Sequence, residues 1–518
     1  MPEAKEASFV PIDAEAVAVA LKHAAGRGHF PANDDDLTAS SGAHKAGLLK
    51  KPLAVMYDLD VWDGMLDLLA SSFGKGCMHA LAVKGTGISS LLKRAVERGF
   101  GLECASIGEV LHAQAVGCPA DRIVFDSPCK TRAELAYALR QGLHLNVDNF
   151  EELKRLAEVR KSLENELPEG GVVGLRINPL CGAGKIAALS VSLADSKFAV
   201  PVDLETEILA VFKEYGWLNC IHVHVGSGGM GMHVLVEGVK TACEFSKRIN
   251  RHLGRRQVTV LDMGGGLHPD YQSDILPGFD KYADQLRQQI DGLLRSPSCS
   301  SQEVYFDKVV TEFGQALSAK AGFLATRLEY VKQVQVGGDK SRSVWGRVWE
   351  RAWALAFGSS HLKMSCQIAV GHFGADLCPR QCYTKEHKRR IEFYDGESCS
   401  PMKRSRQCGS YEETKTTHLA GPLCFQGDFP ARDLEAPALR PGDFAVLREG
   451  GSNTLALFSR HCSRMAPPVL GYRIRREGGA PAVQSLEVLK EAESIKQLCG
   501  FWGADVPPGL ASVVAEVA

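Results

Sequence analysis

HALAVKG, residues 79–85, is a short apolar run that ends in one lysine and one glycine. It opens a series of eight β-rich runs that alternate with amphipathic helical segments over about 240 residues. The later runs are 100–106, 122–128, 144–148, 172–178, 220–226, 258–265 and 308–314. Eight strands at similar spacing predict an α/β fold with a closed (β/α)8 TIM barrel, and an open doubly wound sheet is the structural alternative.

The segments on either side of this series divide the rest of the chain. Residues 1–50 are expected to form an N-terminal extension, and 51–78 a strand and a helix that lead into the barrel at 79–328. The strand at the start of the second segment precedes the barrel and is a candidate member of the next domain. After residue 328, Pro and Gly separate short β-like runs, which predicts a mostly β domain over 329–475 and a peripheral tail over 476–518.

Three features within 329–475 add to this expectation. Trp345, Trp349 and Trp353 share one face of a predicted helix, for which core packing is the expected role and a partner or membrane-surface helix the alternative. The charged segment 385–418 predicts a loop. The expected strands are 367–371, 442–448, 454–458 and 469–474.

Composition excludes several classes of protein. The chain has 518 residues, of which 45% are hydrophobic and 23% charged, and its net charge of −1 provides no basic field for nucleic acid or anionic lipid. No apolar run approaches the roughly 20 residues of a membrane span, and the first residues lack a signal-peptide pattern. The sixteen cysteines show no paired metal-ligand spacing. These features predict a cytoplasmic protein with reduced thiols and no metal, and they leave targeting to an organelle open.

The ends of the predicted strands carry the residues suited to chemistry, because active sites of TIM barrels lie at the carboxyl ends of the strands. Burial of Lys84 would lower its pKa and free the amine as a nucleophile that holds an aldehyde cofactor as a Schiff base. The alternative is a strand-end lysine that reaches water. The other residues expected on this rim are Glu103, Arg176, His224, Ser227, Gly264, Gly265, Gly266, Glu312 and Gln315.

Each of these residues also has a structural interpretation. The flat imidazole of His224 is suited to stacking on a planar cofactor ring, but it is equally a core histidine. The run 264–266 is suited to binding phosphate through backbone N–H groups, or is a tight turn. Glu312 is suited to pairing with a protonated pyridine nitrogen, or to a salt bridge at the rim. Cys424 and Asp428 are suited to donating a proton and holding an ammonium group, or to a turn with a buried cysteine.

Taken together and in order, the motifs resemble those of the fold-type III decarboxylases that depend on pyridoxal 5′-phosphate (PLP). This is the ornithine/diaminopimelate/arginine decarboxylase family, and the resemblance covers about residues 50–475, with 101–130 most similar to the ornithine decarboxylase branch. The matching motifs are AVKG (82–85), GLECAS (101–106), SPCK (127–130), HVGSG (224–228), DMGGG (262–266) and GPLCFQGD (421–428).

The resemblance implies PLP-dependent decarboxylation of a basic amino acid, in amino-acid metabolism or polyamine biosynthesis. Lys84 would form the Schiff base, His224 stack on the ring and Glu312 pair with its nitrogen, while Cys424 would protonate the product and Asp428 hold the distal amine. The family's active unit is a homodimer with two shared sites. Ser227 and the run 264–266 would bind the phosphate, and the remaining cofactor-site candidates are Glu103, Arg176, Gln315 and Asn453.

Departures from the motifs leave the substrate and a second function open. Gln315 stands where the family has a phosphate-binding arginine, and Asn453 where it has a tyrosine. Phe425 replaces the acid that follows the cysteine, and Arg380 and Tyr383 lie near the Arg-Pro-x-x-Tyr spacing of diaminopimelate enzymes without matching it. Ornithine, lysine, arginine and diaminopimelate all remain as substrates. The alternative function is a non-catalytic regulator, similar to antizyme inhibitors, that binds PLP weakly and acts on a protein partner.

Overall fold

The computed structural model describes residues 9–31, 51–184, 189–295, 304–336, 364–384, 386–402, 414–477 and 480–506. Eight parallel strands close into the predicted barrel, in the order β5-β4-β3-β2-β10-β9-β8-β6, and the pairing of β5 with β6 completes the ring. A two-residue strand, β7 (Val200–Pro201), adds to the edge of β6. The barrel strands are β2 (Cys77–Ala82), β3 (Gly101–Cys104), β4 (Ile123–Phe125), β5 (His144–Val147), β6 (Val173–Asn178), β8 (Cys220–Val223), β9 (Val260–Asp262) and β10 (Lys308–Thr311).

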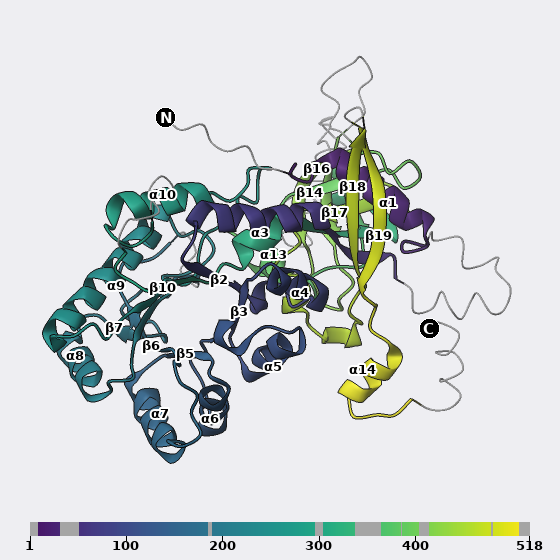
Figure 1. Cartoon of the computed structure of the whole chain (residues 1–518). Helices are drawn as coiled ribbons and strands as arrows, with labels where there is room; N and C mark the ends of the chain where they lie inside the picture. Colours follow the sequence, from purple (N-terminus) through teal and green to yellow (C-terminus); the bar gives the residue numbers. More distant parts are fainter. Residues whose placement is uncertain are drawn as a thin grey trace, which may run out of the picture.

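Helices surround the barrel (Figure 1), and their buried residues are mostly apolar. α9, for example, buries Leu235, Val239 and Ile249 on one side, and α6 begins with a capping box between Thr131 and Glu134. No helix in the described ranges combines the length and apolar character needed to cross a membrane. The surrounding helices are α3 (Leu59–Phe73), α4 (Ser89–Glu97), α5 (Ile107–Ala115), α6 (Arg132–Gln141), α7 (Phe150–Ser162), α8 (Glu205–Glu214), α9 (Met232–Leu253) and α10 (Phe279–Gln289).

The interior of the barrel is layered. Its lower part is a small apolar cluster that includes Val124, Cys220, Val260 and Val310. Side chains alternate along a strand, so residues two positions further along point into the same interior, one layer nearer the carboxyl ends. Those four residues are Asp126, His222, Asp262 and Glu312, all buried. An apolar floor therefore carries a polar layer, and this layer forms the base of the site.

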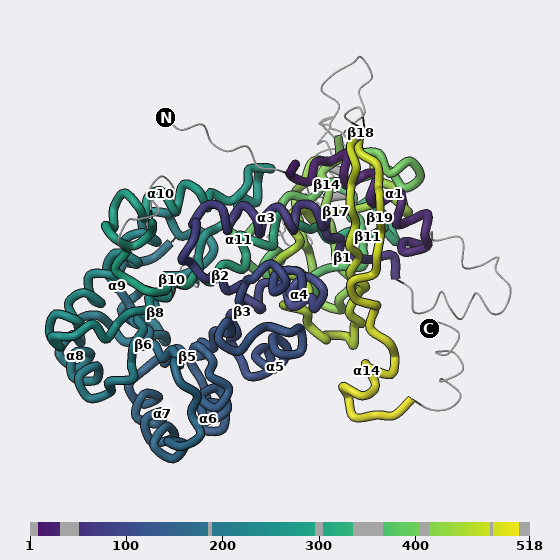
Figure 2. The backbone as a smooth tube through the Cα atoms, viewed as in Figure 1, coloured from purple at the N-terminus to yellow at the C-terminus, as the bar shows by residue number. Residues whose placement is uncertain are grey.

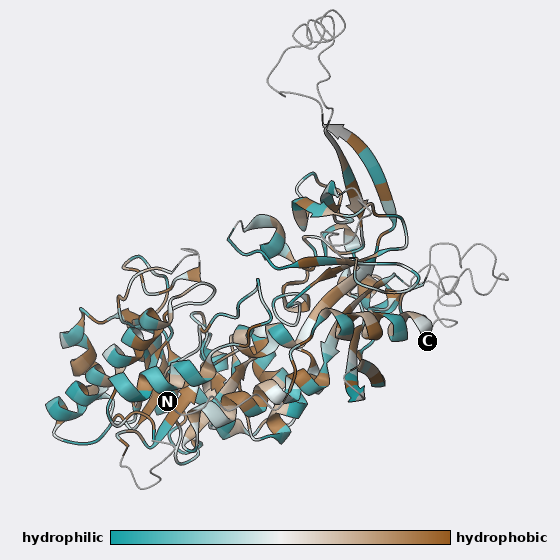
Figure 3. Cartoon of the chain, turned by 90° about the horizontal axis from the view of Figure 1, so that it is seen from above, coloured by the Kyte–Doolittle hydropathy of each residue, from teal (hydrophilic) through white to brown (hydrophobic). Residues whose placement is uncertain are grey.

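The second domain, here called the β domain, combines two sheets. The six-stranded sheet has the order β14-β17-β11-β1-β18-β19, and the four-stranded sheet the order β12-β13-β15-β16. Figure 3 shows hydrophobic residues within both domains and hydrophilic ones along the outer helices. The strands are β1 (Leu53–Asp58), β11 (Gly322–Arg327), β12 (Tyr330–Val336), β13 (Met364–Val370), β14 (Ile391–Tyr394), β15 (Lys415–Ala420), β16 (Ala431–Ala436), β17 (Phe444–Leu447), β18 (Val469–Glu477) and β19 (Ala480–Lys490).

The β domain draws on both ends of the chain. β1 precedes the barrel, yet it lies between β11 and β18 and pairs with the former antiparallel and with the latter in parallel. α1 (Ala14–Gly26) buries Val17, Leu21 and Ala24 and runs beside β19, as the tube in Figure 2 shows. The helix begins at Asp13, whose side chain accepts a hydrogen bond from the Ala16 N–H (2.7 Å).

Several expectations outside the barrel were wrong. The predicted peripheral tail supplies β19, which pairs along the length of β18, and the N-terminal extension supplies α1. Residues 455–457 form a 3-10 turn instead of a strand, and the predicted loop 385–418 contains β14 and the start of β15. The tryptophan helix at 343–355 lies outside the described residues.

Candidate active site

Lys84 lies in a short 3-10 turn, Val83–Gly85, directly after β2. Its neighbours are buried, but 52% of the Lys84 side chain is exposed, so the amine is reachable from the open end of the barrel. Its ammonium group donates to both carboxylate oxygens of Glu103, a buried residue of β3. Burial lowers the pKa of Lys84, but the carboxylates of Glu103, Asp126 and Glu312 outweigh it and raise the pKa above its ordinary value.

The Lys84 loop is held in place by the β domain. The Asn453 backbone N–H donates to the Gly85 carbonyl (3.1 Å), and the Ser452 hydroxyl donates to the same oxygen (3.2 Å). Asn453 has a left-handed backbone (φ +53°), which asparagine tolerates better than most residues. Asn453, which the sequence predicts at the cofactor site, therefore contacts the residue that follows Lys84.

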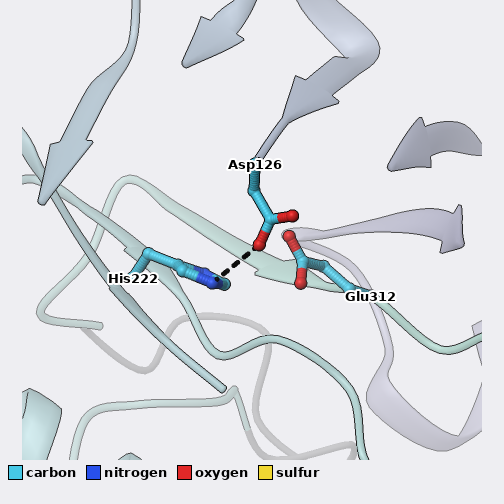
Figure 4. A group of neighbouring side chains, drawn as sticks. All are labelled: Asp126, His222 and Glu312. Carbon is cyan, nitrogen blue, oxygen red and sulfur yellow. Dashed lines mark ion pairs between the residues drawn. The ribbon is translucent and has the colours of Figure 1, made fainter. Parts of the chain in front are cut away.

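His222 forms the centre of the polar layer. Its Nε2 lies 3.1 Å from Asp126 Oδ2 and its Nδ1 lies 3.3 Å from Asp262 Oδ2, with all three side chains buried. Figure 4 shows Asp126, His222 and Glu312 converging from three different strand ends. Burial lowers the pKa of His222, but Asp262 and Asp126 outweigh it and raise the pKa to about 9. His222 is therefore an imidazolium ion at neutral pH.

The same group has the residue types of a metal site, since one ligand atom from each of Asp126, His222 and Glu312 lies within 4.8 Å of the others. A metal requires a neutral imidazole nitrogen. Both nitrogens of His222 face carboxylates, and its raised pKa keeps them protonated. We therefore interpret the group as an ion-paired network that fixes Asp126 and Asp262.

This network predicts that stability falls in alkaline solution. The pKa of histidine is about 6.5 in an unfolded chain and about 9 for His222 in the fold. The stabilising charge is thus fully present below pH 6.5 and is lost as the pH rises through 9. We expect the free energy of unfolding in urea to fall by up to about 3 kcal/mol between pH 6.5 and 9.5.

Two matched variants test whether His222 causes this fall in the free energy of unfolding. His222→Gln should reduce the pH dependence. His79→Gln should retain it, because burial lowers the pKa of His79 to about 4 and this residue is already neutral at pH 6.5. An equal fall in both variants would show that other groups cause it. Glu103, whose pKa burial raises to about 8, is the first to consider.

Glu312 follows β10 and is the carboxyl group without a partner. It is 5% exposed, and its Oε1 has no hydrogen-bond partner among the described residues. Burial raises the pKa of Glu312 well above its ordinary value, and the nearby Asp262, Asp126 and Glu103 raise it further. A buried acceptor of this kind is costly unless a donor meets it. The site thus has a place for a positively charged N–H group.

His224 lies two residues beyond His222. The Gly265 N–H donates to its Nδ1 (3.1 Å), and this bond fixes the neutral tautomer with hydrogen on Nε2. Burial lowers the pKa of His224 to about 3, and the charge of Arg176 lowers it further. The imidazole is therefore a neutral, flat group at the mouth of the barrel.

The run of three glycines after β9 is required by close packing. A Cβ on Gly265 would lie 2.3 Å from the Glu312 carbonyl oxygen, and Gly264 and Gly266 have left-handed backbones (φ +63° and +103°). Two of the three N–H groups already have acceptors within the protein, because Gly264 donates to Asp262 and Gly265 to His224. The run is therefore a tight turn, and two of its three N–H groups are already used within the protein and are not free to bind an anion.

We expect Gly265→Ala to lower the free energy of unfolding by about 1–3 kcal/mol, because the obstructing atom belongs to the backbone and cannot rotate away. Gly108→Ala is the control. Its Cβ would have only the Ser106 hydroxyl within 4 Å, at 3.7 Å, in the first turn of α5. That control should be neutral or slightly stabilising. Urea unfolding of the two variants checks this, and equal stabilities would contradict the packing argument.

The remaining cofactor-site candidates have the following surroundings. Arg176, in β6, is buried with Nη1 at 3.8 Å from Asp126 and 3.7 Å from Asp148. Ser227 follows β8, and its N–H donates to the Leu189 carbonyl (2.9 Å). Gln315 begins α11 (Gln315–Ser318), and its side-chain amide donates to the Tyr271 hydroxyl.

The candidates for substrate binding lie in the β domain, apart from the barrel rim. Cys424 and Phe425 are exposed in the turn between β15 and β16, and the Phe425 ring lies 6.1 Å from that of Tyr383. Arg380 is in the short helix α13 (Pro379–Tyr383). Asp428 is 2% exposed, and its carboxylate accepts hydrogen bonds from the Ala375 and Leu423 N–H groups (2.7 Å each), which fix its position in the turn. Its contact with a substrate amine stays a prediction.

Sequence reasoning missed much of the polar layer. Asp262 opens the motif DMGGG, Asp126 directly precedes SPCK, and His222 lies two residues before HVGSG. Their signal was the period of two that places them inside the barrel. Asn146, which donates to Asp262 (2.9 Å), belongs to the same network.

Comparison with known proteins gives a consistent result. Residues 67–319 match the family described as "Pyridoxal-dependent decarboxylase, pyridoxal binding domain". The chain is 25% identical to diaminopimelate decarboxylase of Methanothermobacter thermautotrophicus over 419 residues, which cover 80% of this chain and 82% of that protein. It is 26% identical to the Pseudomonas aeruginosa enzyme of the same name over 411 residues, with 77% and 81% covered.

Solved structures show the same fold. Diaminopimelate decarboxylase of Helicobacter pylori, complexed with L-lysine, aligns with a TM-score of 0.67 at 20% identity and covers 89% of this chain and 99% of its own. The lysine/ornithine decarboxylase of Vibrio vulnificus, complexed with putrescine, aligns with a TM-score of 0.58 at 18% identity, with 79% and 91% covered. The similarity to the ornithine branch stays a prediction, because these relatives include several diaminopimelate enzymes. Residues 67–319 thus match the pyridoxal-binding domain of the pyridoxal-dependent decarboxylases, and the fold of the chain is the one seen in these solved structures.

Proposed function

We propose that this protein decarboxylates a basic amino acid with PLP held at Lys84. The observation that carries the proposal is the unpartnered Oε1 of Glu312, buried on the same rim as the exposed amine of Lys84. The two groups are the complements that PLP requires, an amine for its aldehyde and a carboxylate for its ring nitrogen. The residues present therefore fit this cofactor.

Lys84, His224 and Glu312 would hold PLP, together with Ser227 and the glycine run. When bound, PLP supplies an electron sink for the bond that loses CO2. Glu312 would keep a proton on the ring nitrogen. His224 would cover the ring with a neutral face, since a charged imidazolium would oppose the protonated ring. Glu103 accepts hydrogen bonds from the Lys84 amine, which places this carboxylate to take and return a proton as Lys84 is freed and reattached.

Completion of the site is proposed to require a second copy of the chain. Cys424 is suited to protonating the product carbon, but it lies in the β domain, whereas Lys84 lies on the barrel rim. The exposed aromatic pair Phe425 and Tyr383 stands beside it and gives this surface an apolar character. A homodimer that brings Cys424 of one subunit to Lys84 of the other follows the pattern of the family.

The substrate class rests on the relatives. Their names include diaminopimelate and lysine/ornithine decarboxylase, and the four basic substrates remain candidates. Phe425 stands where the family has an acid, which favours a substrate whose distal end is recognised differently from ornithine. The loss of two phosphate-binding side chains, at Gln315 and Asn453, favours the second candidate function, a non-catalytic regulator.

The test is CO2 release from ornithine, lysine, arginine and meso-diaminopimelate with excess PLP, with the Lys84→Ala variant as control. Release from one substrate that is absent in the variant would establish the activity and name the substrate. A folded protein that binds PLP but releases no CO2 from any of the four would contradict the proposal. It would favour the regulator, and the search would turn to a protein partner.

A further inference from the structure

A buried arginine lies beside both positions where the family's phosphate contacts are missing. Arg389, just before β14, is 5% exposed, and its guanidinium carbon lies 5.1 Å from the centre of the Tyr271 ring. The Tyr271 hydroxyl accepts the hydrogen bond from Gln315, the first of the two positions. Arg389 Nη2 donates to the carbonyl of Ser452 (2.8 Å), which precedes Asn453, the second position.

The charge of Arg389 is not neutralised. Its Nε and Nη1 have no hydrogen-bond partner, and none of the described carboxylates forms an ion pair with it. The contrast with Arg390 is clear, because that neighbour pairs with Asp274 and Glu449. A buried guanidinium ion without a counter-ion destabilises the fold. This cost indicates that Arg389 has a role other than stabilising the protein.

The other polar groups near Arg389 add no negative charge. The His387 ring lies 4.9 Å from Tyr271, and burial lowers its pKa to about 3, with Arg389 and Arg380 lowering it further. Tyr271 is a buried phenol whose pKa burial raises. Arg389, Arg380, His387 and Tyr271 therefore form a cationic cluster without an acid among its members.

The position of this cluster links it to the catalytic lysine. Tyr271 follows the glycine run 264–266 by five residues, in the loop after β9. Ser452, which accepts from Arg389, donates through its hydroxyl to the carbonyl of Gly85, next to Lys84. A Cβ on Gly85 would lie 3.3 Å from Gly314, the residue before Gln315. Arg389 thus contacts Tyr271 in the loop after β9, and it is linked through Ser452 to the loop after β2 and through Tyr271 to Gln315 after β10.

We propose that Arg389 binds the phosphate group of the cofactor and supplies the charge that Gln315 cannot. This inference rests on the proposed function, because it assumes that PLP occupies the rim. Nε and Nη1 are two donors without a partner on one charged guanidinium, and arginine binds phosphate oxygens through such charge-assisted hydrogen bonds. Arg389 lies in the β domain, beyond the barrel motifs. Those motifs therefore showed only that Gln315 replaces the family's phosphate-binding arginine.

The experiment compares PLP with pyridoxal, which has the same ring and aldehyde but lacks the phosphate. Dissociation constants are measured by absorbance titration for the wild type, Arg389→Met and Lys388→Gln. The last variant removes one charge from the preceding, exposed residue. We expect Arg389→Met to weaken PLP about 10- to 100-fold and to change the pyridoxal constant less than twofold. Lys388→Gln should change neither constant.

Two further variants keep the test decisive. Arg389→Lys keeps the positive charge but replaces the planar guanidinium with a single ammonium group. It is the variant to use if Arg389→Met fails to fold, and we expect it to weaken PLP binding about 3- to 10-fold. Adding Gln315→Arg to Arg389→Met should restore PLP affinity. Equal weakening of PLP and pyridoxal, or no weakening of PLP, would overturn the role of Arg389 and leave the proposed function intact. A wild-type protein that binds neither compound would overturn both.

Discussion

Replacing Lys84 with alanine is expected to reduce decarboxylation by about 10⁴-fold or more, because no other described lysine can take its place. The described lysines Lys130 and Lys320 are also buried, but their amines are committed to carbonyl groups and to Glu152 and Glu449. The purified variant should also lose the visible absorbance of bound cofactor. The measurement is CO2 release together with the absorption spectrum at saturating PLP.

The fold should survive this change. Without the ammonium group, the pKa of Glu103 would rise further, and the neutral acid would remain tolerable in the buried layer. Lys93→Ala is the matched control, since this lysine is exposed on α4 and pairs loosely with Glu97 (4.0 Å). Substantial activity in Lys84→Ala, with Lys93→Ala unchanged, would remove Lys84 from the mechanism.

Glu312→Gln is expected to separate activity from stability. An amide cannot offset the charge of a protonated ring, so we expect kcat to fall about 10²- to 10³-fold. The cofactor-free protein should be as stable as the wild type or more so. Burial and the neighbouring carboxylates raise the pKa of Glu312 and so disfavour its charged form in the cofactor-free fold, and glutamine has the same shape.

Both readouts are needed for Glu312. A residue with only a structural role would lower stability and activity together, whereas the proposed role lowers kcat alone. Glu158→Gln, an exposed member of an ion pair with Arg132 (2.6 Å), is the control and should affect neither. Unchanged kcat in Glu312→Gln would contradict the pairing with the ring nitrogen.

The barrel was predictable because each of its strands is buried on both sides and bounded by a helix. Seven of the eight predicted runs contain the observed strand, and the first, 79–85, overlaps β2 (Cys77–Ala82). The β domain was harder, because its strands pair across long separations and some of them, such as β16 and β19, expose much of their length. β19 illustrates this, since its exposed side chains made a strand of the six-stranded sheet look like a tail.

The candidate site was predictable to the extent that its residues follow strands. Lys84, His224 and Glu312 lie on one rim because the fold forces strand ends together. Arg389 could not be found this way. It precedes β14, in a different domain, and only the three-dimensional contacts with Tyr271 and Ser452 bring it to the site. The two backbone partners of Asp428 were likewise not predictable, because one of them, Ala375, lies 53 residues away in the sequence.

The interleaving of the two domains has a consequence for biosynthesis. β1 pairs in parallel with β18, whose residues are synthesised about 410 positions later. At a ribosomal rate of about 5–20 residues per second, roughly 20–80 s pass before that neighbour exists. During this time the whole barrel can emerge and close, while β1, whose six residues are all buried in the finished fold, lacks its partner β18. A nascent chain stalled before β18 would therefore carry a finished barrel and an exposed β1, the form of this protein most in need of a chaperone.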